Sequence, residues 1–303
     1  MGRVLEDLPR GSRVAILRLR SLGDCVLTTP AVHLLKNARP DLRIAITVED
    51  RFREVFEGNP DIDAILAPAL GPLRAWKPRL CVNLHGGTRS AWMTALSGAR
   101  HRAGYTHYRH QFVYNIRIAR AQDILHVDRT VHTAEHAASA MFFLGVPVSG
   151  IPRARLFTEN IAPSRSGGVT IHPVAATPGK TWHAGGFLKV ADHLKTSGME
   201  PVFIGAATDD LTPFAAHRIV QGAPLSEIKQ LLSAASLFIG NDSGPAHMAA
   251  AFGVPVVAIF GESDPAIWGP WKTPSGVVTS PRGIAAVEVS QVLDAVARLG
   301  VHA

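Results

Sequence analysis

A polar loop between two apolar segments carries the sharpest chemical signal in the chain. Gly240–Gly253 reads GNDSGPAHMAAAFG, in which a buried strand ends and a helix of small residues begins. Asp242 and Ser243 suit the N-cap of this helix, and Pro245 suits its first turn. The free N–H groups and positive dipole of a helix start bind phosphates, and Gly244 has no Cβ to hold a ligand away. The loop therefore predicts a diphosphate-binding site.

A well-capped structural helix is the alternative interpretation of this loop. It accounts for the cap residues and the proline, but not for His247 and the three alanines that come soon after it. His247 lies one turn into the helix, where it could reach a diphosphate or pack against neighbouring elements. The chain has neither GxGxxG after a strand nor GxxxxGK[ST], which disfavours a nicotinamide dehydrogenase and a P-loop enzyme.

Alternating strands and helices must position these residues, and in the first half the pattern predicts a parallel sheet with crossover helices. Ser21–Asp24 is expected to be the loop after the first strand. The expected strands are Arg13–Leu19, Arg43–Val48, Ala64–Leu66 and Leu80–Leu84, and the expected helices are Ala31–Asn37, Arg51–Phe56, Trp92–Leu96 and Thr133–Leu144.

The pattern restarts after a passage rich in glycine and proline between Gly145 and Pro163, so we expect one domain over residues 1–155 and another over residues 156–303. Both halves predict a doubly wound α/β fold. The expected strands of the second half are Gly168–His172, Pro201–Ile204, Leu237–Gly240 and Val254–Phe260, and its expected helices are Phe187–Ser197, Leu225–Ala235, Ala246–Phe252 and Val287–Leu299.

The positive charge of the chain is concentrated in its first half. Residues 1–160 contain 22 Lys/Arg and 14 Asp/Glu, whereas residues 161–303 contain 9 and 10. Between Asp63 and Asp123 there is no acidic residue. The cations of this window are Arg74, Lys77, Arg79, Arg89, Arg100, Arg102, Arg109, Arg117 and Arg120. They favour a polyanionic partner, which could be nucleic acid, an anionic membrane surface or a phosphorylated saccharide; a merely solubilising basic face is the alternative.

The remaining composition indicates a cytoplasmic protein, at most peripheral on a membrane. Cys25 and Cys81 lie far apart without a CxxC pattern, so neither disulfides nor a zinc site are expected. The first residues lack the apolar core of a signal peptide. Apolar stretches such as Val254–Phe260 are strand-sized, well short of the roughly 20 residues that span a bilayer.

Three motifs follow one another along the chain. Arg18–Pro30 (RLRSLGDCVLTTP) fits R-x-x-S-x-G-D-x-x-x-T-x-P, and Pro173–Trp182 (PVAATPGKTW) is similar to P-G-A-x(4)-K-x-W. Asp242–Pro255 meets every fixed position of D-[ST]-G-P-x-H-x-A-A-A-x-G-x-P. Together they resemble the signatures of the ADP-heptose:lipopolysaccharide heptosyltransferases, glycosyltransferase family 9.

The resemblance implies a GT-B architecture of two Rossmann-like domains with a cleft between them. The N-terminal domain would take the acceptor and the C-terminal domain the nucleotide sugar. It also implies an inverting enzyme without a metal or other cofactor, which moves heptose from ADP-heptose to an inner-core lipopolysaccharide sugar. The basic excess lies in the half that would then meet an anionic acceptor on the cytoplasmic face of the inner membrane.

The resemblance assigns donor-side roles in the second domain. Lys180 is expected to balance the departing diphosphate, aided by Thr177. Asp209 follows a strand where the family often keeps an acid for the ribose hydroxyls, although Asp210 is equally placed. The other expected donor-binding residues are Asp242, Ser243, Gly244, Pro245 and His247.

On the acceptor side the resemblance makes Asp24 the general base for the attacking hydroxyl. The alternative is that Asp24 caps the following helix. The expected acceptor-binding residues are Ser21, Gly23, His85, Gly86 and Arg89, and an ordinary turn is the alternative for the last three. His132 and Glu135 are expected to be structural.

Departures from the family pattern leave the acceptor most open. Val174 replaces a glycine, His183–Gly185 replace Pro-x-Glu, and Asn83 stands where an aspartate is common. Leu66–Leu80 is expected to be too short for a full crossover helix. The same enzyme class with another nucleotide sugar or envelope glycan is therefore an alternative, as is a non-catalytic nucleotide-sugar-binding protein. Nucleic-acid binding is not expected, because the tyrosines of the basic window form no aromatic reading motif.

Overall fold

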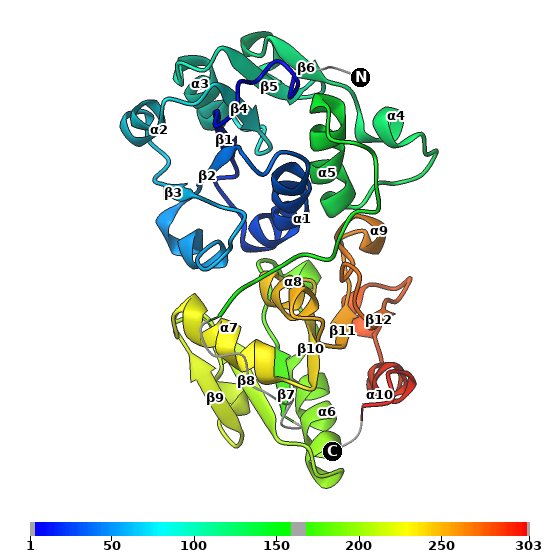
Figure 1. Ribbon diagram of the computed structural model, residues 1–303. Helices are drawn as coiled ribbons and strands as arrows, with labels where there is room; N and C mark the ends of the chain where they lie inside the picture. Colours follow the sequence, from blue (N-terminus) through cyan, green and yellow to red (C-terminus); the bar gives the residue numbers. More distant parts are fainter. Residues whose placement is uncertain (1–3, 159–167, 302–303) are drawn as a thin grey trace. The chain divides into compact units, whose positions relative to one another are not determined.

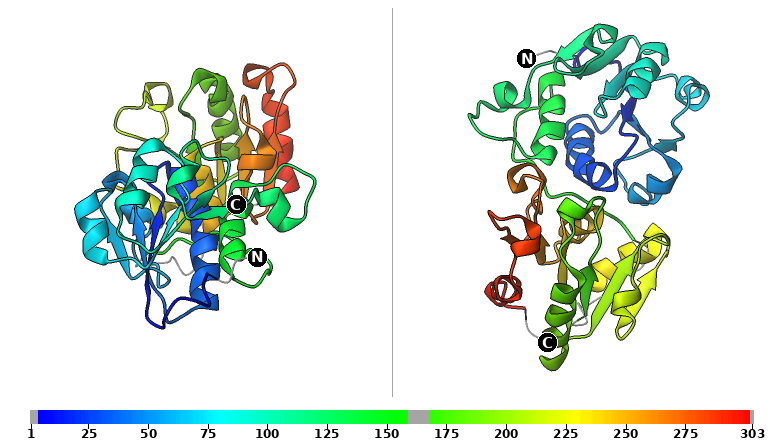
Figure 2. Two further views of the ribbon diagram at one scale, coloured as in Figure 1. Left: turned by 90° about the horizontal axis from the view of Figure 1, so that it is seen from above. Right: turned by 180° about the vertical axis from the view of Figure 1, so that it is seen from behind.

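The computed structural model describes residues 4–158 and 168–301 of the 303-residue chain (Figure 1). The chain divides into two compact units, Met1–Phe157 and Thr158–Ala303. Each unit is a six-stranded, wholly parallel sheet flanked by helices (Figures 1 and 2). The doubly wound α/β fold expected for both halves is confirmed.

The sheet of the first unit has the strand order β3-β2-β1-β4-β5-β6. Its central strands are almost wholly buried, as is usual where helices cover both faces of a parallel sheet. The strands are β1 (Arg13–Leu17), β2 (Arg43–Thr47), β3 (Ala64–Leu66), β4 (Leu80–Asn83), β5 (His101–Tyr105) and β6 (Ile116–Ile118). The helices are α1 (Leu22–Ala38), α2 (Leu70–Trp76), α3 (Thr88–Leu96), α4 (Ala121–Leu125) and α5 (Thr133–Leu144), with short 3₁₀ helices η1 (Asp50–Val55) and η2 (Gln111–Val113).

One expectation for this unit was wrong, and β5, β6 and α4 were not anticipated. Ser21–Asp24 is not a loop, because α1 begins at Leu22 and runs past Pro30 to Ala38. Asp24 lies in its first turn, where it accepts the backbone N–H of Ser21, and this bond helps the helix to begin. The connection between β3 and β4 holds only the short helix α2, in line with the expectation that it is too short for a full crossover helix. The indole of Trp76 ties the end of α2 to the sheet by donating to the carbonyl of Val14 at 3.1 Å.

The sheet of the second unit has the order β12-β11-β10-β7-β8-β9. Its strands are β7 (Val169–His172), β8 (Pro201–Gly205), β9 (Arg218–Gln221), β10 (Leu237–Asn241), β11 (Val256–Ile259) and β12 (Ser275–Val278). The helices are α6 (Ala184–Thr196), α7 (Leu225–Ala234), α8 (Gly244–Ala251), α9 (Pro265–Trp268) and α10 (Val289–Arg298), with 3₁₀ helices η3 (Pro178–Lys180), η4 (Thr212–Phe214) and η5 (Ile284–Ala286).

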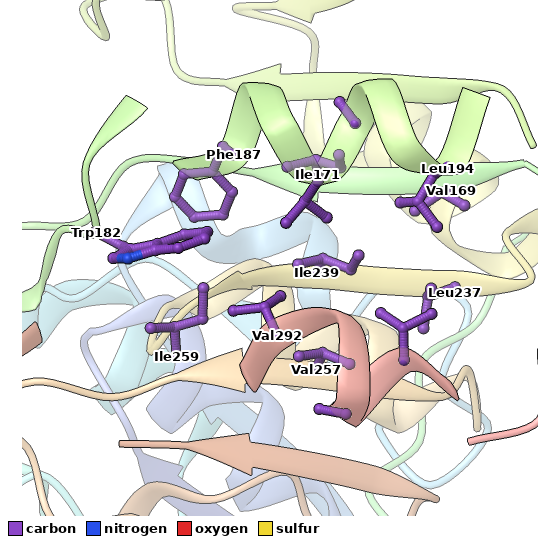
Figure 3. Close-up of a cluster of buried hydrophobic side chains, with 14 of the residues drawn as sticks. Val169, Ile171, Trp182, Phe187, Leu194, Leu237, Ile239, Val257, Ile259 and Val292 are labelled. Carbon is purple, nitrogen blue, oxygen red and sulfur yellow. The ribbon is translucent and has the colours of Figure 1, made fainter. Parts of the chain in front are cut away.

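One hydrophobic cluster joins helices α6 and α10 to the second sheet (Figure 3). Trp182 and Phe187 pack edge to face at 5.0 Å between ring centroids, and both are buried. The indole N–H of Trp182 donates to the carbonyl of Val287 at 2.9 Å, and its backbone N–H donates to Asn241 at 3.0 Å. Because Lys180 lies only two residues before this anchored tryptophan, the core holds the loop that carries the expected phosphate-binding lysine.

Candidate active site

In each unit the residues expected to do chemistry follow the carboxyl ends of central strands, where doubly wound sheets place their ligands. In the first sheet Leu17 of β1 pairs with Asn83 of β4, so the Ser21–Asp24 segment and the His85–Gly86 loop leave the sheet next to each other. In the second sheet β7 and β11 both pair with β10, which brings three loops to one edge.

Asp24 is held by two neighbours at the start of α1. Arg18 donates from Nη1 to its Oδ1 at 3.3 Å, and the hydroxyl of Ser21 donates to Oδ2 at 3.1 Å. The guanidinium of Arg18 is buried and also donates from Nε to the hydroxyl of Thr28 at 3.0 Å. The side chain of Asp24 is 22% exposed, so the carboxylate is fixed in place yet open to a ligand. It both supports the helix start and presents an oriented carboxylate.

The acceptor-side loop is shaped by Asn83. Its buried carbonyl oxygen accepts the backbone N–H groups of His85 and Gly86, each at 3.0 Å. Gly86 has a φ of 78°, and the ring of Tyr108 lies where its Cβ would be, 2.6 Å away. Only glycine fits at position 86. Asn83, which stands where an aspartate is common in the family, forms this turn with its amide oxygen. Arg89 is exposed on α3 and donates to the carbonyl of Pro68.

A layer of aromatic rings and histidines lies close to Arg18 in the same unit. Tyr105 and His136 stack at 4.1 Å between ring centroids, and Tyr105 meets Tyr108 edge to face at 5.5 Å. Burial, with help from His107 and Arg18, lowers the pKa of His136 to about 4. Burial and the nearby Arg18 likewise lower the pKa of His85. His136 is therefore neutral near pH 7, and the positive charge near these rings comes from arginines, Arg18 and Arg120 among them.

In the second unit the predicted helix start forms as expected. Ser243 is the N-cap of α8, and Pro245 lies in its first turn. The hydroxyl of Ser243 is 3.0 Å from Nδ1 of His172 at the end of β7. Burial lowers the pKa of His172 to about 4, so a neutral ring orients this hydroxyl. The Ser243 side chain makes no capping hydrogen bond, so it leaves the first N–H groups of α8 to an anion.

Lys180 lies beside the same helix start. Its ammonium is 3.2 Å from Oδ2 of Asp242, which also accepts the hydroxyl of Ser263 at 2.5 Å. The lysine side chain is 32% exposed, whereas that of Asp242 is 8% exposed. Asp242 thus orients the lysine side chain, and the ammonium keeps further N–H groups that can donate to a phosphate.

The Lys180 loop fits closely against the loop after β11. A Cβ on Gly179 would come within 2.1 Å of the Glu262 carboxylate, and a Cβ on Gly261 within 2.0 Å of the Gly179 carbonyl. Gly261 therefore requires glycine, because its clash is with the backbone, whereas a side chain at position 179 would displace the Glu262 carboxylate. Ser263 and Glu262 were not anticipated from the sequence, although their place just after a buried strand at the same sheet edge is a signal that could have found them.

The other predicted donor residues differ in their placement. The Asp209 carboxylate accepts the N–H of Ala206 at 2.6 Å and is near enough to His172 to affect its pKa. Asp210 is exposed and bonds Thr212 instead, so Asp209 is the better placed of the two acids. His247 is buried, with Nε2 4.0 Å from Oδ1 of Asp242.

Three further predicted residues have simpler environments. Thr177 is exposed, and its backbone carbonyl accepts the N–H of Lys180 and so closes the η3 turn. His132 and Glu135 are structural, as expected: the ring of His132 accepts the N–H of Ala134, and Glu135 pairs with Arg129 at 2.7 Å.

Residues 4–158 and 168–301 contain no cluster of three or more metal-ligating side chains. The chain has an Asp-x-Asp triplet, Asp61–Asp63, but both carboxylates hold the fold together. Asp61 contacts Nδ1 of His33 at 2.8 Å, and Asp63 accepts the N–H of Ile44 at 2.7 Å and pairs with Lys36.

Two doubly wound units, each with polar loops at the carboxyl edge of its sheet, define a glycosyltransferase of the GT-B class. The chain belongs to glycosyltransferase family 9 (heptosyltransferase), whose sequence profile matches residues 73–293. It is 28% identical over 292 residues to lipopolysaccharide heptosyltransferase 3 of Escherichia coli, which covers 84% of this chain and 85% of that protein.

Solved structures agree on the fold. The E. coli heptosyltransferase WaaC with ADP superposes with a TM-score of 0.79 at 17% identity, covering 95% of this chain and 99% of that one. The iron-containing dodecameric glycosyltransferase TibC of enterotoxigenic E. coli superposes with a TM-score of 0.64 at 18% identity, covering 95% and 78%. The family resemblance seen in the three motifs is thereby confirmed.

Proposed function

We propose that this protein is an inverting heptosyltransferase that uses ADP-heptose and acts on an inner-core sugar of lipopolysaccharide. Membership of family 9 and the name of its E. coli relative support the donor and the acceptor class. The observation that carries the proposal is the position of Lys180, 3.2 Å from Asp242 and beside the Ser243-capped start of α8. Two sources of positive potential converge there, as a departing diphosphate requires.

The reaction we propose is a single displacement. The acceptor hydroxyl oxygen forms a bond to the anomeric carbon of the heptose while the bond from that carbon to the diphosphate breaks, which inverts the anomeric configuration. Asp24 takes the hydroxyl proton, and ADP leaves with the electron pair. The bonds from Arg18 and Ser21 support this role, because they fix both carboxylate oxygens while leaving the side chain partly exposed.

The donor site balances the leaving group with the protein's own charges in this proposal. Lys180 and the first N–H groups of α8 neutralise the diphosphate, and Asp209 bonds the ribose hydroxyls. Thr177 lines the same loop, and His247 supports Asp242 from within the helix. On the acceptor side His85, Gly86 and Arg89 contact the sugar, together with Ser21 and Gly23 at the start of α1. Metal independence is part of the proposal and is tested with a chelator.

A different nucleotide sugar or envelope glycan is the second candidate. The replacement of a family aspartate by Asn83 favours it, because this amide shapes the acceptor loop directly. We place the enzyme in the cytoplasm, peripheral on the inner membrane where such acceptors are built. No helix among the described residues is long and apolar enough to cross a bilayer.

The test is product detection by mass spectrometry. Purified protein is given ADP-heptose, ADP-glucose or UDP-glucose with a panel of truncated lipopolysaccharide acceptors, with and without EDTA. Heptose transfer unaffected by EDTA supports the proposal, and NMR of the product reports the anomeric configuration. Transfer only from another nucleotide sugar would establish the second candidate. Binding of ADP-heptose without any transfer would point to a non-catalytic nucleotide-sugar-binding protein.

A further inference from the structure

An apolar ridge is exposed on the first unit. Trp92 and Leu96 of α3 are 48% and 44% exposed, and Phe112 of η2 is 63% exposed. Trp92 and Phe112 meet edge to face at 6.3 Å between ring centroids. We call these three residues the α3 ridge. Large apolar side chains that gather on a surface mark an interaction site far more often than single ones do.

The ridge is a second face of α3 and not a loosely packed core. Ala91, next to Trp92 in the same helix, is buried against Val113 and Tyr114. Arg89, Trp92 and Leu96 are spaced three and four residues apart, so they share the outward face. The helix therefore packs against the core of its unit through one set of residues and still exposes two large apolar side chains to solvent.

Cations without acidic neighbours surround the ridge. Arg74 donates from Nε to the carbonyl of Leu96 at 2.7 Å, and Arg89 shares the helix face. Arg109 precedes His110, whose ring contacts Phe112. All three arginines are exposed. Within residues 4–158 and 168–301, no cation of the acid-free window between Asp63 and Asp123 pairs with a carboxylate.

More positive charge follows where α3 ends. Lys77, Arg79 and Arg100 line a hollow of about 340 Å³ together with Arg13, at the amino ends of β1, β4 and β5. Gly98, two residues beyond the ridge, lies in the same wall. The ridge and this basic hollow thus occupy adjoining segments of the chain.

We propose that the α3 ridge and its cations dock the protein on a bilayer of anionic phospholipids. Aromatic and aliphatic side chains insert at the level of the headgroups while the flanking arginines meet lipid phosphates. A second copy of the chain fits less well, because a symmetric contact would set arginines against arginines. Nucleic acid also fits less well, because the two rings pack against each other at 73° and offer no flat face for stacking bases.

The α3 ridge also lies close to the proposed acceptor-binding loop, and this part of the inference rests on the proposed function. Gly87 ends the acceptor-side loop and is the N-cap of α3, and Thr88 is 3.0 Å from the ring of His110 beside Phe112. A bilayer held against the ridge would therefore lie next to the loop that contacts a lipid-linked acceptor. Docking itself can be measured without any transfer reaction.

The experiment is flotation of the full chain with phosphatidylglycerol/phosphatidylethanolamine vesicles and with phosphatidylcholine vesicles. The test variants are Trp92→Ser with Phe112→Ser, and Arg74→Glu with Arg109→Glu. Val148→Ser with Val277→Ser removes two other exposed apolar side chains, and Lys189→Glu with Lys195→Glu makes the same charge change on α6. Circular dichroism and thermal melting verify that every variant is folded.

We expect wild type to float with the anionic vesicles only, less so at high salt. Each test pair should weaken this binding about tenfold or more, and neither control pair should weaken it. Equal binding by the test and control pairs would overturn the proposal. Three other results would also overturn the proposal. They are a wild type that does not float, a dimer that the Trp92/Phe112 substitutions dissociate, and duplex DNA as the only ligand whose binding the test substitutions weaken. If the flotation results are as expected but the product assay detects no sugar transfer, the docking proposal stands and only the proposed function is contradicted.

Discussion

Replacing Lys180 by glutamine should weaken ADP binding while leaving the fold intact. The lysine side chain is 32% exposed, so its ammonium is neither a freely solvated surface charge nor a buried one. A hydrogen bond to a charged group contributes about 1.5–3 kcal/mol in such a setting. Since about 1.4 kcal/mol corresponds to a tenfold change, Kd for ADP should rise about 10- to 150-fold.

The effect on folding should be much smaller. Lys180 pairs with Asp242, and a partly exposed ion pair of this kind contributes about 0–1 kcal/mol to the free energy of unfolding. Ser263 continues to donate to Asp242 in the variant. Thermal melting without ligand should therefore differ little from wild type, which separates loss of the phosphate contact from loss of the loop.

Isothermal titration calorimetry with ADP measures the change directly. Lys189→Gln is the matched control, because it removes an exposed cation of the same unit from α6. Higher ionic strength should narrow the difference between wild type and Lys180→Gln, since salt screens the lost charge. A Kd within twofold of wild type in Lys180→Gln, or an equal effect in the control, would refute the assignment of Lys180 to the diphosphate.

Two further predictions concern stability. Gly86→Ala places a Cβ 2.6 Å from the Tyr108 ring at a φ of 78° and should lower the free energy of unfolding by about 1–3 kcal/mol. Gly185→Ala, in the first turn of α6 with only the His183 ring near its Cβ position, should instead raise it by about 0.5–1 kcal/mol; thermal melting compares the two variants, and equal shifts would contradict the geometry. Burial holds the pKa of His136 and of His172 near 4, below the value of 6.5 for an unperturbed histidine, so the unfolded chain binds more protons between these values. The free energy of unfolding should therefore decrease as pH falls from about 6.5 to about 4, by up to about 1.4 kcal/mol per pH unit for each ring, and equal urea midpoints at pH 7 and pH 5 would argue against this.

Most interior strands could be predicted because both faces of a parallel strand are buried, but β5 was missed because the half-buried His101 and Arg102 interrupt its apolar pattern. Leu237–Asn241 and Val256–Ile259 are such continuous apolar runs. The edge strand Arg218–Gln221 was missed because its residues are exposed or half-buried and its pattern resembles a loop. The start of α1 was missed because Gly23 and Pro30 are poor helix residues, and only the capping bond between Ser21 and Asp24 explains it.

The candidate site could be predicted where its residues are neighbours in sequence. The Ser243-capped helix start needs only local geometry, so its pattern was sufficient. Arg18 belongs to the first motif, but its contact with Asp24 depends on how α1 turns back over β1. Tyr108 and His136 come from distant segments that only the fold brings to the same layer, and no spacing in the sequence points to them.

The division of the chain after residue 155 into an acceptor and a donor domain stays a prediction, as do the individual site assignments. Of these assignments, that of Asp24 as the general base is central to the proposed mechanism. Asp24 also stabilises the start of α1, so a variant must keep its shape. Asparagine has the same shape and keeps one acceptor oxygen for Arg18 or for Ser21, but its NH₂ group cannot accept the other bond, and it cannot take a proton at neutral pH.

The most direct measurement is therefore the transfer rate of Asp24→Asn with ADP-heptose and a truncated lipopolysaccharide acceptor, beside wild type and Asp50→Asn. Asp50 is an exposed carboxylate of the same unit in η1. We predict that Asp24→Asn binds ADP with unchanged affinity and transfers heptose about 10²- to 10⁴-fold more slowly, while Asp50→Asn matches wild type. Transfer by Asp24→Asn within about tenfold of wild type would contradict the assignment of Asp24 as the base.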